Sequence, residues 1–410
     1  MIGAVQFSCP NKKIKGGIDM SLRTKHLNLR TLGVSIAAAA AIAVSGASAA
    51  AAQDTFKIGA ICSLTGPAAG FGKPYCDGIE AYIKAWNARG GYKGQKIELT
   101  MLDDETSAVT GVNAFRRLGD DKDVRVIWLG ISSNSVLAIK PLASEVKIPI
   151  VSGGAVDTIG VPADPYLFKV APGTEDFSVA LLKWAKSKGI KSLASINATD
   201  AYGQSEAKYL RELGPKYGIK VVAQETFAVT DTNFTSQLIS IRSAKPDLVY
   251  SGAVGRPAIL IFQQYKQLKL PFQIALSQGA LFGGFFKAIG GPKEAEGILT
   301  VTNQGTLGKA IGGEPAAEYG KLEAALGRPV LIFDTFGWDH GIVTEWAAMH
   351  SDGSREGIRA ALDKIKELPA INGPFNYRPD MHIGQDDRGL RVVVYKDGKF
   401  VLDDGMAMKK

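Results

Sequence analysis

The sequence has few of the residues that most often carry out catalysis or bind metals. Its 410 residues include three cysteines and four histidines, and none of the histidines pairs with cysteines or carboxylates at the spacing of a metal site. It contains no G-x-S-x-G motif, which disfavours an α/β-hydrolase. After residue 52 it has no run of 18 apolar residues, the length that indicates a membrane-spanning helix.

A glycine-rich segment, residues 65–73, superficially resembles a phosphate-binding loop but fails that pattern. Pro67 stands where the P-loop requires glycine, and Pro74 follows Lys73 where a serine or threonine would bind magnesium. The acidic run at residues 103–105 follows a predicted strand, and we interpret it as a solvated face or helix cap rather than a metal site. We therefore expect no cofactor and no metal, and we expect that the protein is not an enzyme.

The first 52 residues have the pattern of a cleaved export signal. A basic stretch at residues 23–30 precedes an uncharged apolar run at residues 32–44, and small residues follow. The apolar run is shorter than the roughly 20 residues that cross a bilayer, which disfavours a membrane anchor. We expect cleavage after Ala49 or Ala52 and a periplasmic location.

Removing the export signal changes the charge and the cysteine count. Residues 1–52 hold six of the 48 basic and one of the 40 acidic residues, so the net charge falls from +8 to +3. Nothing in the remainder resembles a nucleic-acid-binding protein. Cys62 and Cys76 remain, and in an oxidising compartment they either form a disulfide or stay as separate buried thiols.

The rest of the chain alternates strand-like and helix-like segments in two successions. In the first, strands are predicted at residues 56–61, 97–102, 124–129 and 148–151, with helices at 75–87, 112–118 and 132–146. A similar alternation runs through residues 177–276. Three helices at 315–326, 333–349 and 355–368 follow, and then a hairpin at 390–402 with its turn at residues 396–398. The pattern predicts an α/β protein with two doubly wound, Rossmann-like lobes.

Several short motifs stand along the chain: Ile58-Gly59-Ala60, Leu64-Thr65-Gly66-Pro67, Asp77-Gly78 and Asn87-Ala88-Arg89-Gly90-Gly91, and further on Ser132-Ser133, Ser152-Gly153-Gly154 and Asp200-Ala201-Tyr202-Gly203. The first four resemble the opening of the type I periplasmic binding proteins, and more narrowly of the leucine/isoleucine/valine-binding receptors of ABC transporters, and the later three continue the match. The resemblance covers essentially all of the chain after the export signal. It implies two lobes joined by a three-strand hinge, with crossovers that we expect near Pro172, Asn303 and Gly373. Lobe 1 would then comprise residues 55–172 and 304–373, and lobe 2 residues 173–303 and 374–410.

The same resemblance implies a solute site between the lobes. Ser132, with Ser133 beside it, corresponds to the serine that holds the ligand carboxylate at the start of a helix. A hydroxyl and free helix-start N–H groups suit that role, although a plain N-cap is the alternative. Phe71 corresponds to an aromatic residue that covers the ligand. Tyr202 corresponds to its second-lobe counterpart, unless it is a turn residue packed on its own lobe.

Two positions depart from the amino-acid-binding pattern. The family's threonine falls on Val156, close to Gly154, and the carboxylate that pairs with the ligand ammonium falls on Gln278. A valine cannot accept a hydrogen bond, and a glutamine lacks the charge that offsets burial of an ammonium. An α-amino acid is thus a poor ligand, unless Asp157 supplies the charge. Arg256 either pairs with an anion or is a solvated loop residue.

The resemblance predicts a monomeric periplasmic receptor that delivers a small carboxylate-bearing solute to the membrane subunits of an ABC permease. Aromatic acids and 2-oxo acids are favoured, and branched-chain amino acids stay open. A ligand-sensing module of a signalling system is the alternative that the same fold supports.

Overall fold

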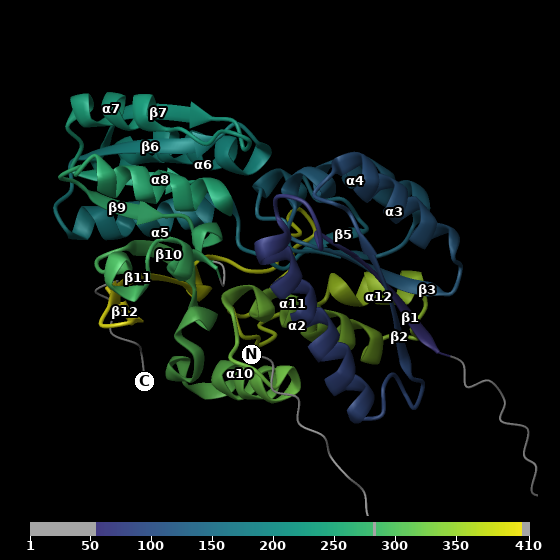
Figure 1. The fold of residues 1–410 in the computed structure, drawn as a ribbon. Coiled ribbons are helices and arrows are strands. Elements are labelled where there is room, and N and C mark those ends of the chain that lie inside the picture. The colour runs from purple at the N-terminus through teal and green to yellow at the C-terminus, as the bar shows by residue number, and fades with distance from the viewer. Residues whose placement is uncertain (1–54, 282–283, 404–410) are drawn as a thin grey trace, which may run out of the picture. The chain divides into compact units, whose positions relative to one another are not determined.

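The structure, a computed structural model, describes residues 55–281 and 284–403. The expected export signal, residues 1–52, lies outside the described residues. The described chain builds two sheets of mainly parallel strands with helices packed against them, in agreement with the predicted α/β class (Figure 1).

The first sheet has the strand order β2-β1-β3-β4-β5, and all its neighbouring strands are parallel. The strands are β1 (Phe56–Cys62), β2 (Ile97–Asp103), β3 (Val124–Leu129), β4 (Ile150–Ser152) and β5 (Leu167–Lys169). β1 and β3 are almost continuously buried because helices cover both faces of the sheet. The order places a topological switch point between β1 and β3, where ligands bind in doubly wound sheets.

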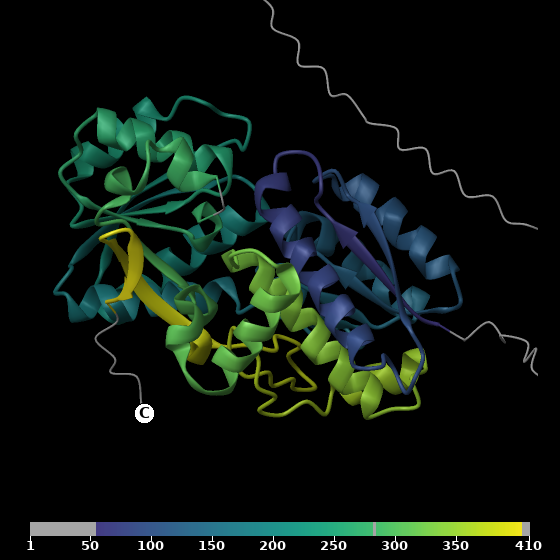
Figure 2. The ribbon, with the colours of Figure 1, turned by 60° about the horizontal axis from the view of Figure 1, so that its bottom comes forward.

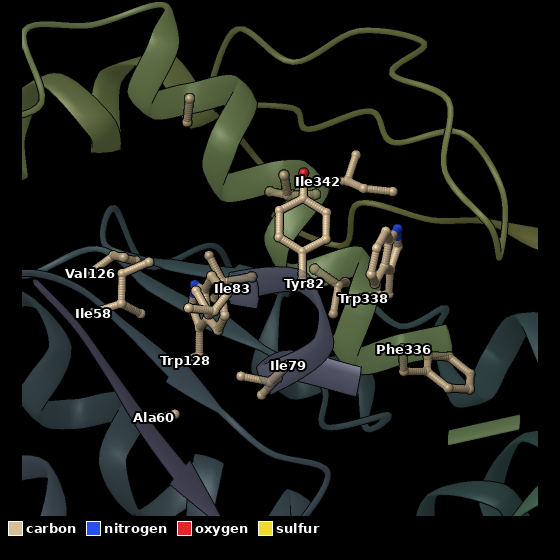
Figure 3. Packing of buried hydrophobic residues seen from close by; sticks show 14 of the residues in the cluster. Ile58, Ala60, Ile79, Tyr82, Ile83, Val126, Trp128, Phe336, Trp338 and Ile342 are labelled. Carbon is tan, nitrogen blue, oxygen red and sulfur yellow. The ribbon is translucent and has the colours of Figure 1, made fainter. Parts of the chain in front are cut away.

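Separate hydrophobic cores form on the two faces of this sheet. On one face lie α3 (Ala108–Asp120) and α4 (Ser133–Val146). On the other, α2 (Ala69–Ala88) packs along α11 (Ile332–Met349), and Figure 3 shows side chains of β1, β3, α2 and α11 in one cluster. The two helices approach so closely that a Cβ on Gly78 or on Gly337 would overlap a backbone oxygen of the facing helix, and glycine at both positions permits this contact.

The second sheet has the strand order β12-β11-β10-β9-β8-β6-β7. The strands are β6 (Ser192–Ala198), β7 (Lys220–Phe227), β8 (Leu248–Gly252), β9 (Gln273–Leu276), β10 (Leu299–Asn303), β11 (Leu390–Lys396) and β12 (Lys399–Leu402). Only β10–β11 and β11–β12 are antiparallel among the described pairs. Helix α5 (Thr174–Ser187) precedes β6, and α6 (Ala201–Leu213), α7 (Thr235–Ala244) and α8 (Arg256–Gln267) follow β6, β7 and β8. The predicted hairpin is confirmed, with Asp397 and Gly398 at positive φ as a two-residue turn requires.

The chain crosses between the lobes three times. It leaves the first lobe between β5 and α5, and it returns after β10 through α10 (Gly313–Leu326), which packs on α2 together with α11 (Figure 2). α12 (Arg355–Leu362) packs against β3. The last crossover differs from the expectation at Gly373. Phe375 and Tyr377 belong to the first lobe's core and Ile383 forms a bridge to β5, so this crossover lies nearer to β11.

Other differences from the sequence-based expectations are local. α2 begins at Ala69, inside the expected loop, and continues through Pro74, which lacks an N–H and so leaves one helical hydrogen bond unmade. The short strands β5 and β10 were not predicted. The helix expected over residues 355–368 ends at Leu362.

Candidate functional site

A cavity of about 130 Å³ lies at the carboxyl ends of strands from both sheets. A single water requires only about 10–15 Å³, so the cavity has room for a small organic solute. In the first lobe its walls come from the segments after β1, β2, β3 and β4 and from the start of α11, and in the second lobe from the segments after β6, β8 and β9. The lining residues are Ala68, Phe71, Thr106, Ile131, Ser132, Ser133, Asn134, Ala155, Asp200, Tyr202, Val254, Gln278, Gly279 and Phe333.

The start of α4 supplies hydrogen-bond donors to the cavity. Ser132 is the N-cap, and its Oγ accepts from the backbone N–H of Ser135 at 3.4 Å. Ser133 Oγ accepts from the backbone N–H of Ala155 at 3.2 Å, so its own hydroxyl hydrogen stays available for another acceptor. Both side chains line the cavity, and the positive end of the helix dipole favours an anion there.

An aromatic pair contributes to the apolar part of the cavity wall. Phe71 lies in the first turn of α2 and Phe333 near the start of α11, with their ring centroids 5.6 Å apart. A disulfide between Cys62 and Cys76 joins the end of β1 to α2, with the two Cα atoms 6.3 Å apart. The sequence indicated Phe71 through the family resemblance, but nothing near Phe333 in the sequence marked it as a site residue. It reaches the cavity because α11 packs beside α2.

The second lobe contributes polar groups that are largely engaged within that lobe. Asp200 caps α6, with its Oδ1 accepting from the backbone N–H of Gly203 at 2.8 Å. Tyr202 lines the cavity, but its hydroxyl is paired with Ser277 Oγ at 2.9 Å. Gln278 is 7% exposed and also lines the cavity. Lysine, arginine and histidine are absent from the lining residues given above, so hydroxyl and amide groups would have to hold an anionic ligand.

Three of the expected ligand-binding residues do not line this cavity. Arg256 is exposed at the first position of α8. Val156 packs in the core behind α4, and Gly154 lies against Ile159 of the same core. Between them, Ala155 takes the place at the cavity wall, because its backbone N–H binds Ser133.

Asp157 does not face the cavity either. Its Oδ2 accepts from the hydroxyl of Thr174, and also from the backbone N–H of Glu175 at 3.3 Å. Both partners lie in the first turn of α5, directly after the first crossover. Asp157 therefore ties the two lobes together at the hinge and does not supply a charge to the cavity.

Glu206, which lies beside Tyr202 and Gln278, is a candidate site residue that was not identified from the sequence. It is 1% exposed, it accepts a hydrogen bond from the hydroxyl of Tyr250, and burial raises its pKa to about 8. A signal was present, since Glu206 follows Tyr202 by four positions and so lies on the same face of α6.

Within residues 55–281 and 284–403, no group of three histidine, cysteine or acidic side chains is arranged to hold a metal ion. Over the same residues, none of the helices combines the length and the apolar character needed to cross a membrane.

Comparisons with known proteins agree on one family. Residues 55–399 match a family described as periplasmic binding protein. The chain is 26% identical over 356 residues to the Leu/Ile/Val-binding protein BraC3 of Rhizobium johnstonii, covering 86% of this chain and 93% of that protein. It is 27% identical over 250 residues to an amino acid binding protein of Pseudomonas aeruginosa, covering 59% of this chain and 65% of that relative.

Solved structures show the same fold. An extracellular ligand-binding receptor from Rhodopseudomonas palustris HaA2 superposes with a TM-score of 0.77 at 27% identity, covering 86% of this chain and all of the other. A solute binding protein of an ABC transporter from R. palustris, in complex with benzoate, superposes with a TM-score of 0.74 at 22% identity, covering 85% of this chain and 95% of the other. The chain therefore belongs to the periplasmic binding protein family, in its type I, leucine/isoleucine/valine-binding branch.

Proposed function

We propose that the protein is a periplasmic receptor that captures a small carboxylate-bearing solute between its lobes and delivers it to an ABC permease. The observation that carries this proposal is the cavity, in which Ser132 and Ser133 offer donors at the positive end of α4. Phe71 and Phe333 would contact the apolar body of the solute. Residues 1–52 would direct export and be removed.

Within that class, the cavity favours carboxylates that lack an ammonium group, such as aromatic acids and 2-oxo acids. Gln278 stands where the family resemblance places a carboxylate, and Asp157 is engaged at the hinge. Asp200 is the remaining carboxylate at the cavity, and one of its oxygens already caps α6. Burying an ammonium without an opposite charge is costly. Because relatives are named as amino acid or Leu/Ile/Val-binding proteins, branched-chain amino acids are the competing class of ligand.

A thermal-shift screen of the two ligand classes tests the proposal. The panel contains benzoate, phenylpyruvate and 4-methyl-2-oxopentanoate against phenylalanine, leucine and valine. A ligand present at 100 times its Kd should stabilise the folded protein by about 2.7 kcal/mol. We expect stabilisation by one or more of the acids without an amino group. Stabilisation by leucine or valine alone would overturn the ligand preference, and no stabilisation by any carboxylate would overturn the proposed function.

A further inference from the structure

A small buried chamber lies in the second lobe, behind the part of the cavity wall that Tyr202 and Gln278 form. These two side chains line both the main cavity and the chamber. The remaining polar side chains around the chamber are Ser178, Glu206 and Tyr250, and the other lining residues are apolar. Its volume of about 10 Å³ accommodates approximately one water-sized group.

The hydrogen bonds around the chamber are incomplete at two atoms. Glu206 Oε2 and Gln278 Oε1 are buried and have no hydrogen-bond partner. Leaving such a group unpaired costs about 1–3 kcal/mol, and folded proteins rarely do so. The other polar groups are paired, since Tyr250 donates to Glu206 and Ser178 donates to the backbone carbonyl of Thr174. The two unpaired oxygens thus indicate that a further polar group belongs beside them.

The side-chain amide of Asn197, near the carboxyl end of β6, is a third buried group without hydrogen-bond partners. Both amide atoms of Asn197, at the end of β6, are buried and unpaired. Asn197 Nδ2 and Glu206 Oε2 both occupy the space that a side chain at Gly252 would fill. Asn197 and Glu206 therefore bring buried, unpaired polar atoms close together in the second lobe.

Glu206 is uncharged at neutral pH. Burial raises its pKa to about 8, and the titratable groups that act on it are Tyr250 on β8, Tyr202 on its own helix and Asp200 at the start of that helix. No ion pair involves Glu206 in the part of the chain that the structure describes. A neutral carboxyl group both donates and accepts a hydrogen bond.

We propose that this chamber is a second, hydrogen-bonding compartment of the ligand site. In it, Glu206 acts as a positioning residue that holds Gln278 ready to bind an uncharged hydroxyl or carbonyl group at the far end of the ligand. This inference rests on the proposed function and narrows the class of ligand that the receptor would bind. The carboxylate binds at Ser132 and Ser133, and the opposite end of the ligand carries a polar group without charge. Neither Glu206 in its neutral form nor the Gln278 amide offsets the charge of an ammonium.

Calorimetric titration with benzoate and 4-hydroxybenzoate tests this inference, because the two probes differ only in the hydroxyl at the far end. The variants are Glu206→Leu, which removes the hydrogen bonds, and Glu206→Gln, which keeps an uncharged hydrogen-bonding group. Glu212→Gln, an exposed carboxylate on the same helix, is the matched control. We expect the wild type to prefer 4-hydroxybenzoate by about tenfold or more. The preference should disappear in Glu206→Leu and persist in Glu206→Gln and in the control.

The pH dependence gives a second readout that a purely structural role of Glu206 would not change. Above pH 8, ionisation of Glu206 should weaken binding of 4-hydroxybenzoate by the wild type more than by Glu206→Gln, whose side chain does not titrate. This comparison decides the question even if Glu206→Leu does not fold. An equal preference for both probes in the wild type, or identical pH profiles in wild type and Glu206→Gln, would overturn the inference. Absence of binding by both probes would instead count against the proposed function.

Discussion

Replacing Ser133 with alanine should weaken both ligand binding and the fold, by amounts that can be measured separately. In the structure, Ser133 Oγ accepts from the backbone N–H of Ala155 at 3.2 Å and its side chain is 8% exposed. The substitution leaves that N–H without its partner, which should lower the free energy of unfolding by about 1–3 kcal/mol. A hydrogen bond to a ligand carboxylate contributes about 1.5–3 kcal/mol, so its loss should raise Kd by roughly 10- to 150-fold.

Calorimetric titration well below the melting temperature measures the loss of affinity apart from the loss of stability. Ser144→Ala is the matched control, because Ser144 lies on the same helix and donates to Asp164 at 2.9 Å but does not line the cavity. Its Kd should equal that of the wild type. If Ser133→Ala bound the wild-type ligand within twofold of the wild-type Kd, Ser133 would not be a carboxylate ligand and the assignment of the anion site would be wrong.

Four further substitutions test other parts of the account. Removing both Cys62 and Cys76 should lower the free energy of unfolding by about 3 kcal/mol for a loop of this length, and reductant should bring the wild type to the same value in denaturant unfolding. Phe71→Ala should raise Kd by roughly fivefold or more, because the cavity loses one ring of an aromatic pair. Glu206 keeps its proton in the folded state between pH 4.5 and about pH 8, so the free energy of unfolding of the wild type should fall as pH rises through this window. Glu206→Gln should not show this loss, and unfolding at pH 5 and pH 8.5 should reveal a difference of up to several kcal/mol. Arg256→Ala should leave Kd unchanged in calorimetry, since Arg256 is exposed and does not line the cavity.

The sheets and helices follow closely from local patterns in the sequence. Buried strands such as β3 are mostly apolar, and the turn at Asp397 and Gly398 is a two-residue hairpin signal. Helical periodicity did not locate the start of α2, because Pro74 and the nearby glycines are typical of a loop. The extra turn nevertheless packs on the facing helix, where Phe71 contacts Phe333. Tertiary contacts therefore decided this boundary.

The site was only partly predictable because its residues meet through long-range packing. The resemblance placed Ser132, Ser133 and Tyr202 at the cavity, and the structure brings them there. Phe333 could not be found in this way, since it reaches the cavity through the packing of α11 on α2. Val156 was assigned by alignment to a contact position, but the backbone turns it into the core and presents Ala155 instead. A shift of one residue along an extended segment reverses the direction of the side chain.

The identity of the solute that remains bound to the purified protein tests the central claim most directly. The full-length protein would be produced, purified without added ligand, and denatured, and the released small molecules would be identified by mass spectrometry. The account predicts a small carboxylic acid without an amino group, carrying an uncharged hydroxyl or carbonyl at the end opposite the carboxylate. Recovery of leucine, isoleucine or valine, or of a solute without a carboxylate, would contradict it.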